Sequence, residues 1–215
     1  MCIRDSTSTI LSGGIAAKKN GVPSLFHIHE IPTGNKLYEF FSGKIINWYS
    51  SKVLTVSDSV KKHWLKHIDD KKIERIYNGI IFSKTDSLVE LERDQDDFVI
   101  TSVARIIPYK GHGYLIDVAN ELIKKSTKFK FLIVGDTLSS YVSYEKSVKQ
   151  KVKDLGLEHQ IKFLGFRDDV SSILKQSDLF IHPAIAPDPL PTVLFESLHN
   201  DLPSMATNLG GAIEI

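Results

Sequence analysis

The stretch FVITSVARIIPYKGHGYLIDVANELIKK, residues 98–125, joins a strand pattern to a helix pattern through a loop that contains glycine and basic residues. Its opening run, FVITSVA, carries apolar or β-branched residues on both faces, which is typical of a parallel strand covered by helices on both sides. The helix pattern after Gly111 has one apolar face, formed by Leu115, Val118, Ala119, Leu122 and Ile123. A strand, a loop and a helix in this order predict one unit of an α/β fold.

The same alternation extends along the chain. Short apolar runs occur at 24–29, 52–56, 75–80, 98–104, 129–135, 161–165, 178–183 and 203–207. Helical patterns lie between them at 57–68, 111–125 and 143–156. This order predicts an α/β fold of doubly wound parallel sheets. The polar, acidic and non-periodic segment 83–97 predicts a linker between two such domains.

Composition excludes several classes of protein. The 27 Lys and Arg residues balance 26 Asp and Glu residues, so the strongly basic surface of a nucleic-acid-binding protein is not expected. Cys2 is the only cysteine, which excludes an internal disulfide or a thiolate metal cage and favours a reducing compartment. No apolar run has the length of a membrane span, and the first residues lack a signal-peptide core. We therefore expect a cytoplasmic protein.

The loops after the predicted strands are the first places to look for chemistry, because open α/β sheets bind ligands outside the carboxyl ends of their strands. Arg105 and Lys110 lie in such a loop, just before Gly111 and a helix start. Two cations and a helix N-terminus form a suitable site for a diphosphate. Alternatively, this is a solvated loop with incidental charges.

Two other strand ends carry candidate contacts. Phe166 and Arg167 follow the run 161–165 and could contact a base, whereas Asp168 and Asp169 look like N-caps of the next helix. His29 closes the run 24–29 and is a candidate for polar contact with a reacting group. A histidine satisfied within the core is the alternative, and it fits His27 better.

The segment from Pro187 to Glu214 carries carboxylates and a glycine pair. Asp188 lies at the carboxyl end of a strand, and Pro191–Thr192 then start a helix that contains Glu196. A carboxylate there can accept two ribose hydroxyls, although Glu196 could equally be a surface helix residue. Gly210 and Gly211 permit backbone amides to approach an anion, or they form a plain turn.

Several well-known motifs are missing from the sequence. It contains neither a G-x-G-x-x-G after the first strand of either domain nor a G-x-x-x-x-G-K-[ST]. It also lacks H-E-x-x-H and G-x-S-x-G. Dehydrogenases, P-loop enzymes, zinc peptidases and α/β-hydrolases are therefore disfavoured.

The ordered motifs resemble those of family 4 of the retaining glycosyltransferases, which have the GT-B fold of two Rossmann-like domains. Asp188 and Glu196, eight positions apart and followed by Pro203 and GGAIE, are similar to the family's E-x7-E and G-G-x-x-E signature. The segments HIHE, VLTVSDSVKKHWL, IYNGI and ARIIPYKGHGYLIDVA are similar to its N-domain histidine loop, last N-domain strand and helix, interdomain turn and diphosphate loop. The resemblance covers residues 22–215.

The resemblance implies a role for each matching residue. Arg105 and Lys110 would neutralise the diphosphate of a nucleoside-diphosphate-sugar donor, and Glu196 would bind its ribose. Asp188 stands where the family usually has the glutamate that contacts the transferred sugar. His29 would lie close to the reacting sugar. Phe166 and Arg167 would contact the base, and the backbone of Gly210 and Gly211 would lie near the phosphates.

The resemblance also implies the domain organisation and the activity. We expect a partial acceptor-side domain at 1–82, the linker at 83–97 and a partial donor-binding domain at 98–215, within a fragment of a longer enzyme. It would transfer a sugar to a hydroxyl of a glycan or lipid-linked acceptor with retention, without cofactor or metal, in cell-surface polysaccharide or glycolipid synthesis. Peripheral contact with the inner membrane face is a further expectation.

Some residues depart from the family pattern. Asp188 is one methylene shorter than glutamate, and His199-Asn200-Asp201 stands where small residues and glycine are usual. These differences leave the sugar open. A nucleotide-sugar epimerase of the same fold, or a non-catalytic nucleotide- or glycan-binding module, are the alternative functions.

Overall fold

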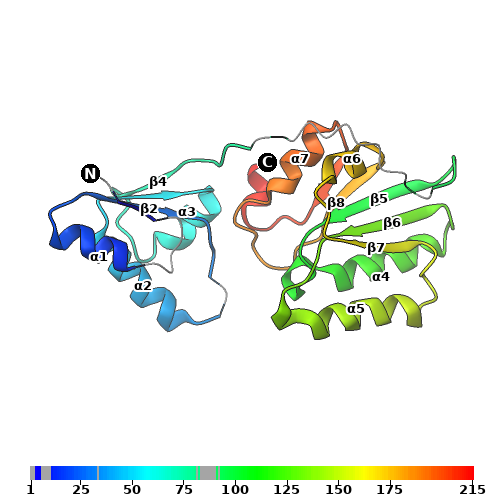
Figure 1. Cartoon of the computed structure of the whole chain (residues 1–215), viewed down its shortest axis with the longest axis horizontal. Coiled ribbons are helices and arrows are strands. Elements are labelled where there is room, and N and C mark those ends of the chain that lie inside the picture. Colours follow the sequence, from blue (N-terminus) through cyan, green and yellow to red (C-terminus); the bar gives the residue numbers. More distant parts are fainter. Residues whose placement is uncertain (1–2, 6–10, 33, 81, 83–90, 92) are drawn as a thin grey trace. The chain divides into compact units, whose positions relative to one another are not determined.

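The computed structural model describes residues 3–5, 11–32, 34–80, 82, 91 and 93–215 (Figure 1). The chain divides into two compact units. The first comprises Met1–Gly79, Pro187–Pro191 and Gly210–Ile215, and the second comprises Ile80–Ala186 and Thr192–Leu209. The sequence placed 187–191 and 210–215 with the second domain, whereas their contacts group them with the first unit. Within the predicted linker, residues 83–90 and 92 lie outside the described residues.

The first unit is built on a four-stranded parallel sheet in the order β1-β2-β3-β4. Its strands are β1 (Ile3–Asp5), β2 (Ser24–Ile28), β3 (Lys52–Thr55) and β4 (Ile73–Arg75). Its helices are α1 (Ser12–Lys19), α2 (Lys36–Tyr49), α3 (Asp58–Trp64) and the 3₁₀ helix η3 (Gly210–Glu214). α1 and α2 pack together on one face of the sheet (Figure 1). Phe26, Ile46 and Trp64 are fully buried and form part of its core.

The second unit contains a five-stranded parallel sheet in the order β7-β6-β5-β8-β9. Its strands are β5 (Phe98–Val103), β6 (Phe129–Val134), β7 (Ile161–Gly165), β8 (Leu179–His182) and β9 (Ser204–Ala206). Its helices are η1 (Pro108–Lys110), α4 (His112–Ile123), η2 (Ser139–Tyr141), α5 (Val142–Asp154), α6 (Val170–Lys175) and α7 (Thr192–His199). α4 and α5 lie on one face, and α6 and α7 on the other (Figure 1).

Both faces of this second sheet are buried, as the apolar runs predict. Ile100 and Phe131 pack with α4 and α5 in one core, whereas their neighbours Val99 and Leu132 pack with Ile173 of α6 in another. Successive residues of a strand point to opposite faces, so an uninterrupted apolar run supplies both cores. The predicted α/β architecture with parallel sheets is confirmed.

Three details of the sequence prediction are wrong. The strand predicted at 75–80 is β4 at 73–75, because its partner β3 ends at Thr55 and pairs only as far as Arg75. The strand β1 was not predicted. On α4 the residue Val118 is 49% exposed and Ile116 is buried instead. Ile116 is four residues after His112 and three residues before Ala119, so the three share the buried face. Val118 lies about 200° around the helix from Ile116.

Helix ends follow the local sequence closely. The Ser57 side chain caps α3 by accepting from the Val60 amide at 3.1 Å. Gly156 ends α5 with φ +67° while Leu157 N donates to Val152 O at 3.0 Å, which is a Schellman cap. α7 ends in the same way, with Leu202 N donating to Ser197 O at 3.0 Å, but the left-handed residue is Asp201, with φ +53°.

Replacing Asp201 by glycine is therefore expected to stabilise the second unit by about 0.5–1 kcal/mol, since the substitution removes left-handed strain and a negative charge from a helix C-terminus. The gain is limited by the larger entropy of glycine in the unfolded chain. Thermal unfolding would measure it. The reverse change at the equivalent cap, Gly156→Asp, should lower the melting temperature, and stabilisation by both changes would contradict this reading of the caps.

Candidate functional site

The loops that follow β5, β6, β7 and β8 lie along one edge of the second unit, because all of these strands are parallel (Figure 1). Arg105 and Lys110 follow β5, Asp136 follows β6, and Phe166 and Arg167 follow β7. The structure thus brings the predicted diphosphate and base residues to the same sheet edge. α7, which carries Glu196, begins after the loop that leaves β8.

The loop that carries Lys110 is held by its neighbours through the backbone. Ile106 N donates to Asp136 O at 2.9 Å, and Thr137 Oγ1 donates to Ile106 O at 2.8 Å. On the other side, Ile185 N donates to Tyr109 O at 2.8 Å. The hydroxyls of Tyr109 and Tyr141 are hydrogen-bonded to each other. The strand-end loops of β6 and β8 therefore fix the path of this loop, and these contacts could not be predicted from the sequence.

Gly111 connects the loop to α4 at a point where only glycine fits. Its φ is +74°, and a Cβ built there would lie 1.8 Å from Pro183 O. No side chain caps α4 at this position. The Gly113 backbone hydrogen-bonds the Tyr144 side chain. The helix dipole and the amides of the first turn make such an N-terminus favourable for an anion.

The two predicted cations differ in their surroundings. The Arg105 side chain is exposed, and no ion pair links it to another described residue. Lys110 is half-buried beside the start of α4. Burial, followed by the electrostatic effect of the neighbouring Lys110 and His182, lowers the pKa of the fully buried His112 to about 4. His112 is therefore neutral at physiological pH, and the positive charge here belongs to Lys110 and Arg105.

Glu196 is half-buried on α7, and its carboxylate forms no hydrogen bond or ion pair with the other described side chains. Burial alone raises the pKa of this carboxyl group above its usual value. A half-buried carboxylate without a protein partner is unfavourable for stability, and such groups occur at functional sites. Of the two interpretations of Glu196, ribose binding agrees better with this environment than an ordinary surface helix residue does.

The raised pKa of Glu196 gives a pH-dependent prediction. The folded chain holds the proton more tightly than the unfolded chain, so the associated stability is present below the ordinary pKa and is lost as pH rises through the raised pKa. Glutamine imitates the protonated form at every pH. We expect Glu196→Gln to raise the melting temperature at neutral pH and to have no such effect in acid. An equal change of melting temperature at neutral and acidic pH would contradict this prediction. So would the same pH dependence in Glu158→Gln, a control at an exposed glutamate.

The residues after β7 differ in their surroundings, and their contact with a base stays a prediction. Phe166 is 77% exposed, and therefore accessible for stacking. Asp169 occupies the N-cap position of α6, but its side chain does not cap the helix. It instead pairs with Arg167, whose Nε lies 2.7 Å from Asp169 Oδ1. The predicted side-chain cap is wrong, because the guanidinium competes successfully for this carboxylate and lowers its pKa.

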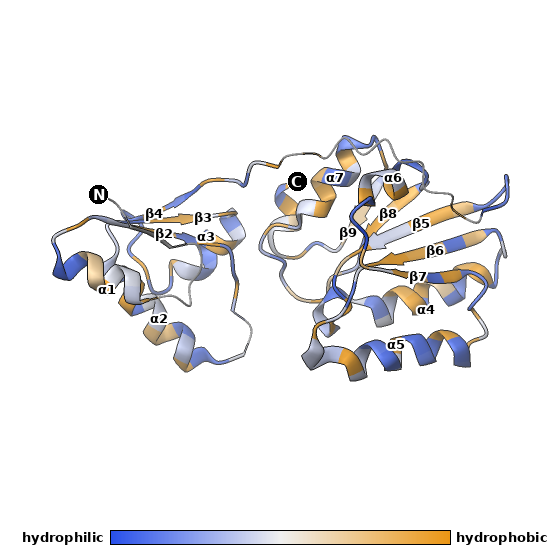
Figure 2. Ribbon diagram, viewed as in Figure 1, coloured by the Kyte–Doolittle hydropathy of each residue, from blue (hydrophilic) through white to orange (hydrophobic). Residues whose placement is uncertain are grey.

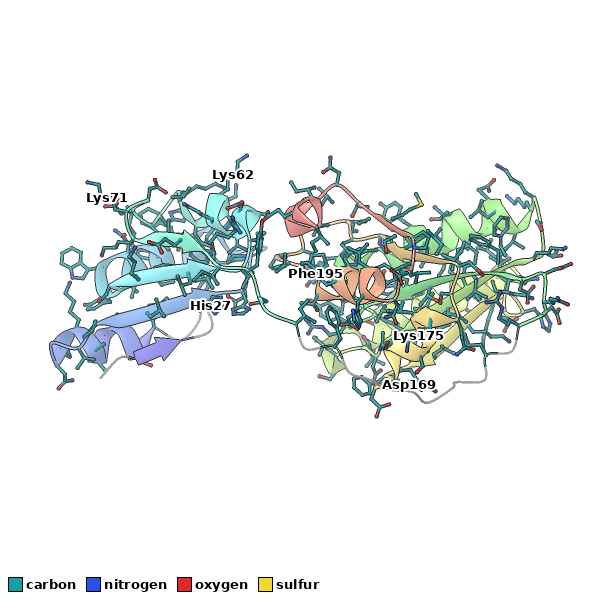
Figure 3. The ribbon with its side chains drawn as sticks, turned by 90° about the horizontal axis from the view of Figure 1, so that it is seen from above. His27, Lys62, Lys71, Asp169, Lys175 and Phe195 are labelled. Carbon is teal, nitrogen blue, oxygen red and sulfur yellow. The ribbon has the colours of Figure 1, made fainter. Side chains whose placement is uncertain are left out.

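In the first unit, the predicted histidine lies just beyond the end of β2. His29 Nε2 lies 3.2 Å from His27 Nδ1, and the two rings are tilted with centroids 4.2 Å apart. His27, labelled in Figure 3, belongs to β2 of the first unit. It is buried whereas His29 is partly exposed, in agreement with the core interpretation of His27. Trp64 Nε1 donates to Glu30 O at 3.0 Å and so holds the loop that follows His29.

The glycine pair packs against the loop that carries Asp188. Gly211 N donates to Asp188 O at 2.7 Å. A Cβ on Gly210 would lie 2.3 Å from Asp188 O, and one on Gly211 would lie 2.1 Å from Pro189 O. These glycines are thus needed for close backbone packing, and the Gly211 amide is used within the chain.

Glu214, which ends the GGAIE segment, caps the start of α3, a role that was not predicted from the sequence. Its carboxylate accepts from the amides of Asp58 at 2.7 Å and Ser59 at 2.8 Å, at the start of α3. A negative group at a helix N-terminus is stabilising. The GGAIE segment was already part of the family resemblance, so this glutamate belonged to a motif visible in the sequence.

Comparison with known proteins identifies the family. A family model described as "Glycosyl transferases group 1" matches residues 83–215. The UDP-Gal:alpha-D-GlcNAc-diphosphoundecaprenol alpha-1,3-galactosyltransferase of Escherichia coli is 27% identical over 96% of this chain and 57% of its own length. An uncharacterized glycosyltransferase of Haemophilus influenzae is 26% identical over 85% of this chain and 49% of its own length.

Solved structures agree with this match. HepE of Anabaena in complex with UDP-glucose has a TM-score of 0.89 and 28% identity, over 99% of this chain and 61% of that chain. The same protein in complex with UDP and glucose has a TM-score of 0.87. This chain therefore spans about half to three fifths of the length of these proteins. The predicted α/β fold of GT-B type is confirmed, and the chain belongs to the glycosyl transferases group 1 family.

Proposed function

We propose that this chain is part of a retaining glycosyltransferase of family 4 that takes a sugar from a UDP-sugar. The observation that carries the proposal is the strand-end arrangement in the second unit. Arg105, Lys110 and the uncapped start of α4 gather positive charge at one sheet edge. A nucleoside diphosphate is the ligand that this arrangement fits best. UDP-sugars are named for the Escherichia coli relative and for the HepE complex.

The proposed chemistry depends on charge development at the donor. As the bond between the sugar and the diphosphate breaks, its electron pair and the negative charge go to the leaving diphosphate. Arg105, Lys110 and the α4 amides would stabilise that charge without a metal. Glu196 would accept the ribose hydroxyls, and Phe166 would stack on the base. Retention rests on the resemblance alone, and no carboxylate is assigned as a nucleophile.

The proposed acceptor is a hydroxyl of a glycan carried on a lipid diphosphate. The name of the Escherichia coli relative includes such a diphosphoundecaprenol acceptor. We place His29 and Asp188 on the acceptor and sugar side of the reaction, as the family resemblance implies. With a lipid-linked acceptor the enzyme would work at a membrane surface, and we place it at the cytoplasmic face, in polysaccharide or glycolipid synthesis.

A transfer assay on the full-length protein tests this function. UDP release from UDP-galactose, UDP-glucose and UDP-N-acetylglucosamine would be measured with and without a glycan-diphosphate-lipid acceptor. The proposal predicts release that depends on the acceptor and a product with the donor's anomeric configuration. Donor conversion without acceptor would instead identify an epimerase, and UDP-sugar binding without turnover would identify a binding module.

A further inference from the structure

The triplet His199-Asn200-Asp201 lies at the end of α7, where the sequence departs from the small residues and glycine of the family pattern. Its middle residue connects α7 to the neighbouring helix α6. We propose that Asn200 is a positioning residue, which holds Glu196 of α7 at a fixed place relative to the segment that contacts the base. This inference rests on the proposed function, because it concerns the binding of the same UDP-sugar.

Both ends of the Asn200 side-chain amide form hydrogen bonds. Its Nδ2 donates to Glu196 O at 2.7 Å, and its Oδ1 accepts from Ser171 Oγ at 3.0 Å. Glu196 O is one of the last four carbonyls of α7, and Ser171 is the second residue of α6. One amide therefore caps the end of one helix and binds the start of another. Alanine or glycine at this position could do neither.

The two linked helices carry the two halves of the proposed nucleoside site. Glu196 lies four residues before Asn200, on the same face of α7. α6 begins at Val170, directly after the segment 166–169 that is proposed to contact the base. The base and the ribose of UDP are joined by a single bond, so their protein contacts must keep a fixed separation. A bond between the helices that carry these contacts would preorganise the site and so favour binding.

Other contacts hold the same end of α7. Ser197 Oγ lies 2.8 Å from Ser204 Oγ of β9. The His199 ring stacks on the Phe82 ring, with centroids 3.9 Å apart and planes 10° apart. Figure 2 shows that α7 combines hydrophobic residues with hydrophilic ones. These contacts fix α7 to the sheet and to the chain just before the predicted linker, whereas the Asn200 bond fixes it relative to α6.

A simple helix cap is the alternative role for Asn200, because asparagine is common at the ends of helices. The chain contains a cap for comparison. Gln176 follows α6, and its Nε2 donates to Ser172 O, also four residues back, at 3.0 Å. This bond stays within one helix, whereas the Asn200 amide also accepts from a second helix. Gln176 is therefore a matched control that separates a cap from a link.

Calorimetric titration of the full-length protein with UDP tests the link. Asn200→Ala should weaken UDP binding about fivefold, the effect of losing one hydrogen bond. Ser171→Ala breaks the link and leaves the cap of α7 intact, and it should weaken binding by a similar factor. The double variant should bind about as well as Asn200→Ala, because both changes break the same bond. Gln176→Ala should bind UDP like the parent.

Two further readouts separate positioning from a general loss of structure, in variants verified as folded by circular dichroism. Inorganic pyrophosphate has neither ribose nor base, so the parent and Asn200→Ala should bind it equally well. In transfer assays, Asn200→Ala should raise the KM for the UDP-sugar about fivefold and leave kcat within about twofold. This split is expected because the groups proposed to stabilise the leaving diphosphate are unchanged.

Unchanged UDP affinity in both Asn200→Ala and Ser171→Ala would overturn the inference and leave the proposed function intact. An equal loss of UDP and pyrophosphate binding in Asn200→Ala would also overturn it, since this would indicate a general loosening of the second unit. The same weakening in Gln176→Ala would assign the effect to helix capping. Absence of UDP binding by the parent would instead refute the proposed function, and this inference with it.

Discussion

Replacing Lys110 by alanine in the full-length protein is expected to lower turnover about a hundredfold. Loss of one preorganised hydrogen-bond donor to a developing negative charge costs about 2.7–4 kcal/mol in other enzymes. Lys110 is half-buried at the start of α4, where its charge helps to keep His112 neutral. The substitution would remove the cation where the leaving diphosphate gains negative charge. The main effect should therefore fall on turnover.

A matched lysine separates this effect from a general loss of charge. Lys125→Ala, an exposed lysine just beyond α4, should leave turnover within about twofold, in line with the small effects of most surface substitutions. Steady-state kinetics with a saturating UDP-sugar would provide both numbers. Near-normal turnover in Lys110→Ala would remove this lysine from the proposed mechanism.

Replacing Gly111 by alanine is expected to destabilise the second unit by more than about 3 kcal/mol. The new methyl group would lie 1.8 Å from Pro183 O, and the residue would keep a φ of +74° that alanine adopts at a cost. Since α4 begins at the next residue, relief of this clash must move the helix or the loop that follows β8. Either movement would displace Lys110.

Gly156→Ala is the control that isolates the backbone contribution. Its φ is +67°, and a Cβ built there has nothing within 4 Å. This variant should cost about 1 kcal/mol from conformation alone. Denaturant unfolding of the two variants would measure the difference. If Gly111→Ala were no worse than Gly156→Ala, the close approach of Gly111 to Pro183 would be refuted.

The fold and much of the candidate site could be predicted from sequence because their signals are local. Residues 98–103 and 129–134 are apolar on both faces, and this pattern directly reflects burial between two helical layers. Parallel strands then force their following loops to one edge, which is why Arg105 and Phe166 could be assigned there. Ser57 and Gly156 are equally local signals for helix ends.

The remaining features depend on contacts between distant segments. Thr137 and Tyr141 hold the Lys110 loop through bonds across the sheet edge, and nothing near them in sequence predicts these contacts. Asp169 was misassigned because an N-cap motif does not show that an arginine two residues away binds the same carboxylate. The short strand β1 has three residues and too little pattern to be detected.

The glycine pair illustrates how one motif can serve packing as well as chemistry. The sequence alone left an anion contact and a plain turn open for Gly210 and Gly211. Both glycines lie where a Cβ would clash with the Asp188–Pro189 backbone. Close packing of the Asp188 loop is therefore sufficient to require them, and their predicted phosphate contact stays a prediction.

Thermal unfolding with added nucleotide tests whether the second unit binds uridine diphosphate with Glu196 on the ribose. The chain and its Glu196→Gln variant would be melted with UDP, GDP and ADP in turn. We expect UDP to raise the melting temperature of the parent chain and GDP and ADP to have smaller effects. The variant should lose most of the shift from UDP. An equal UDP shift in the variant, or no shift in a cooperatively folded parent chain, would contradict it.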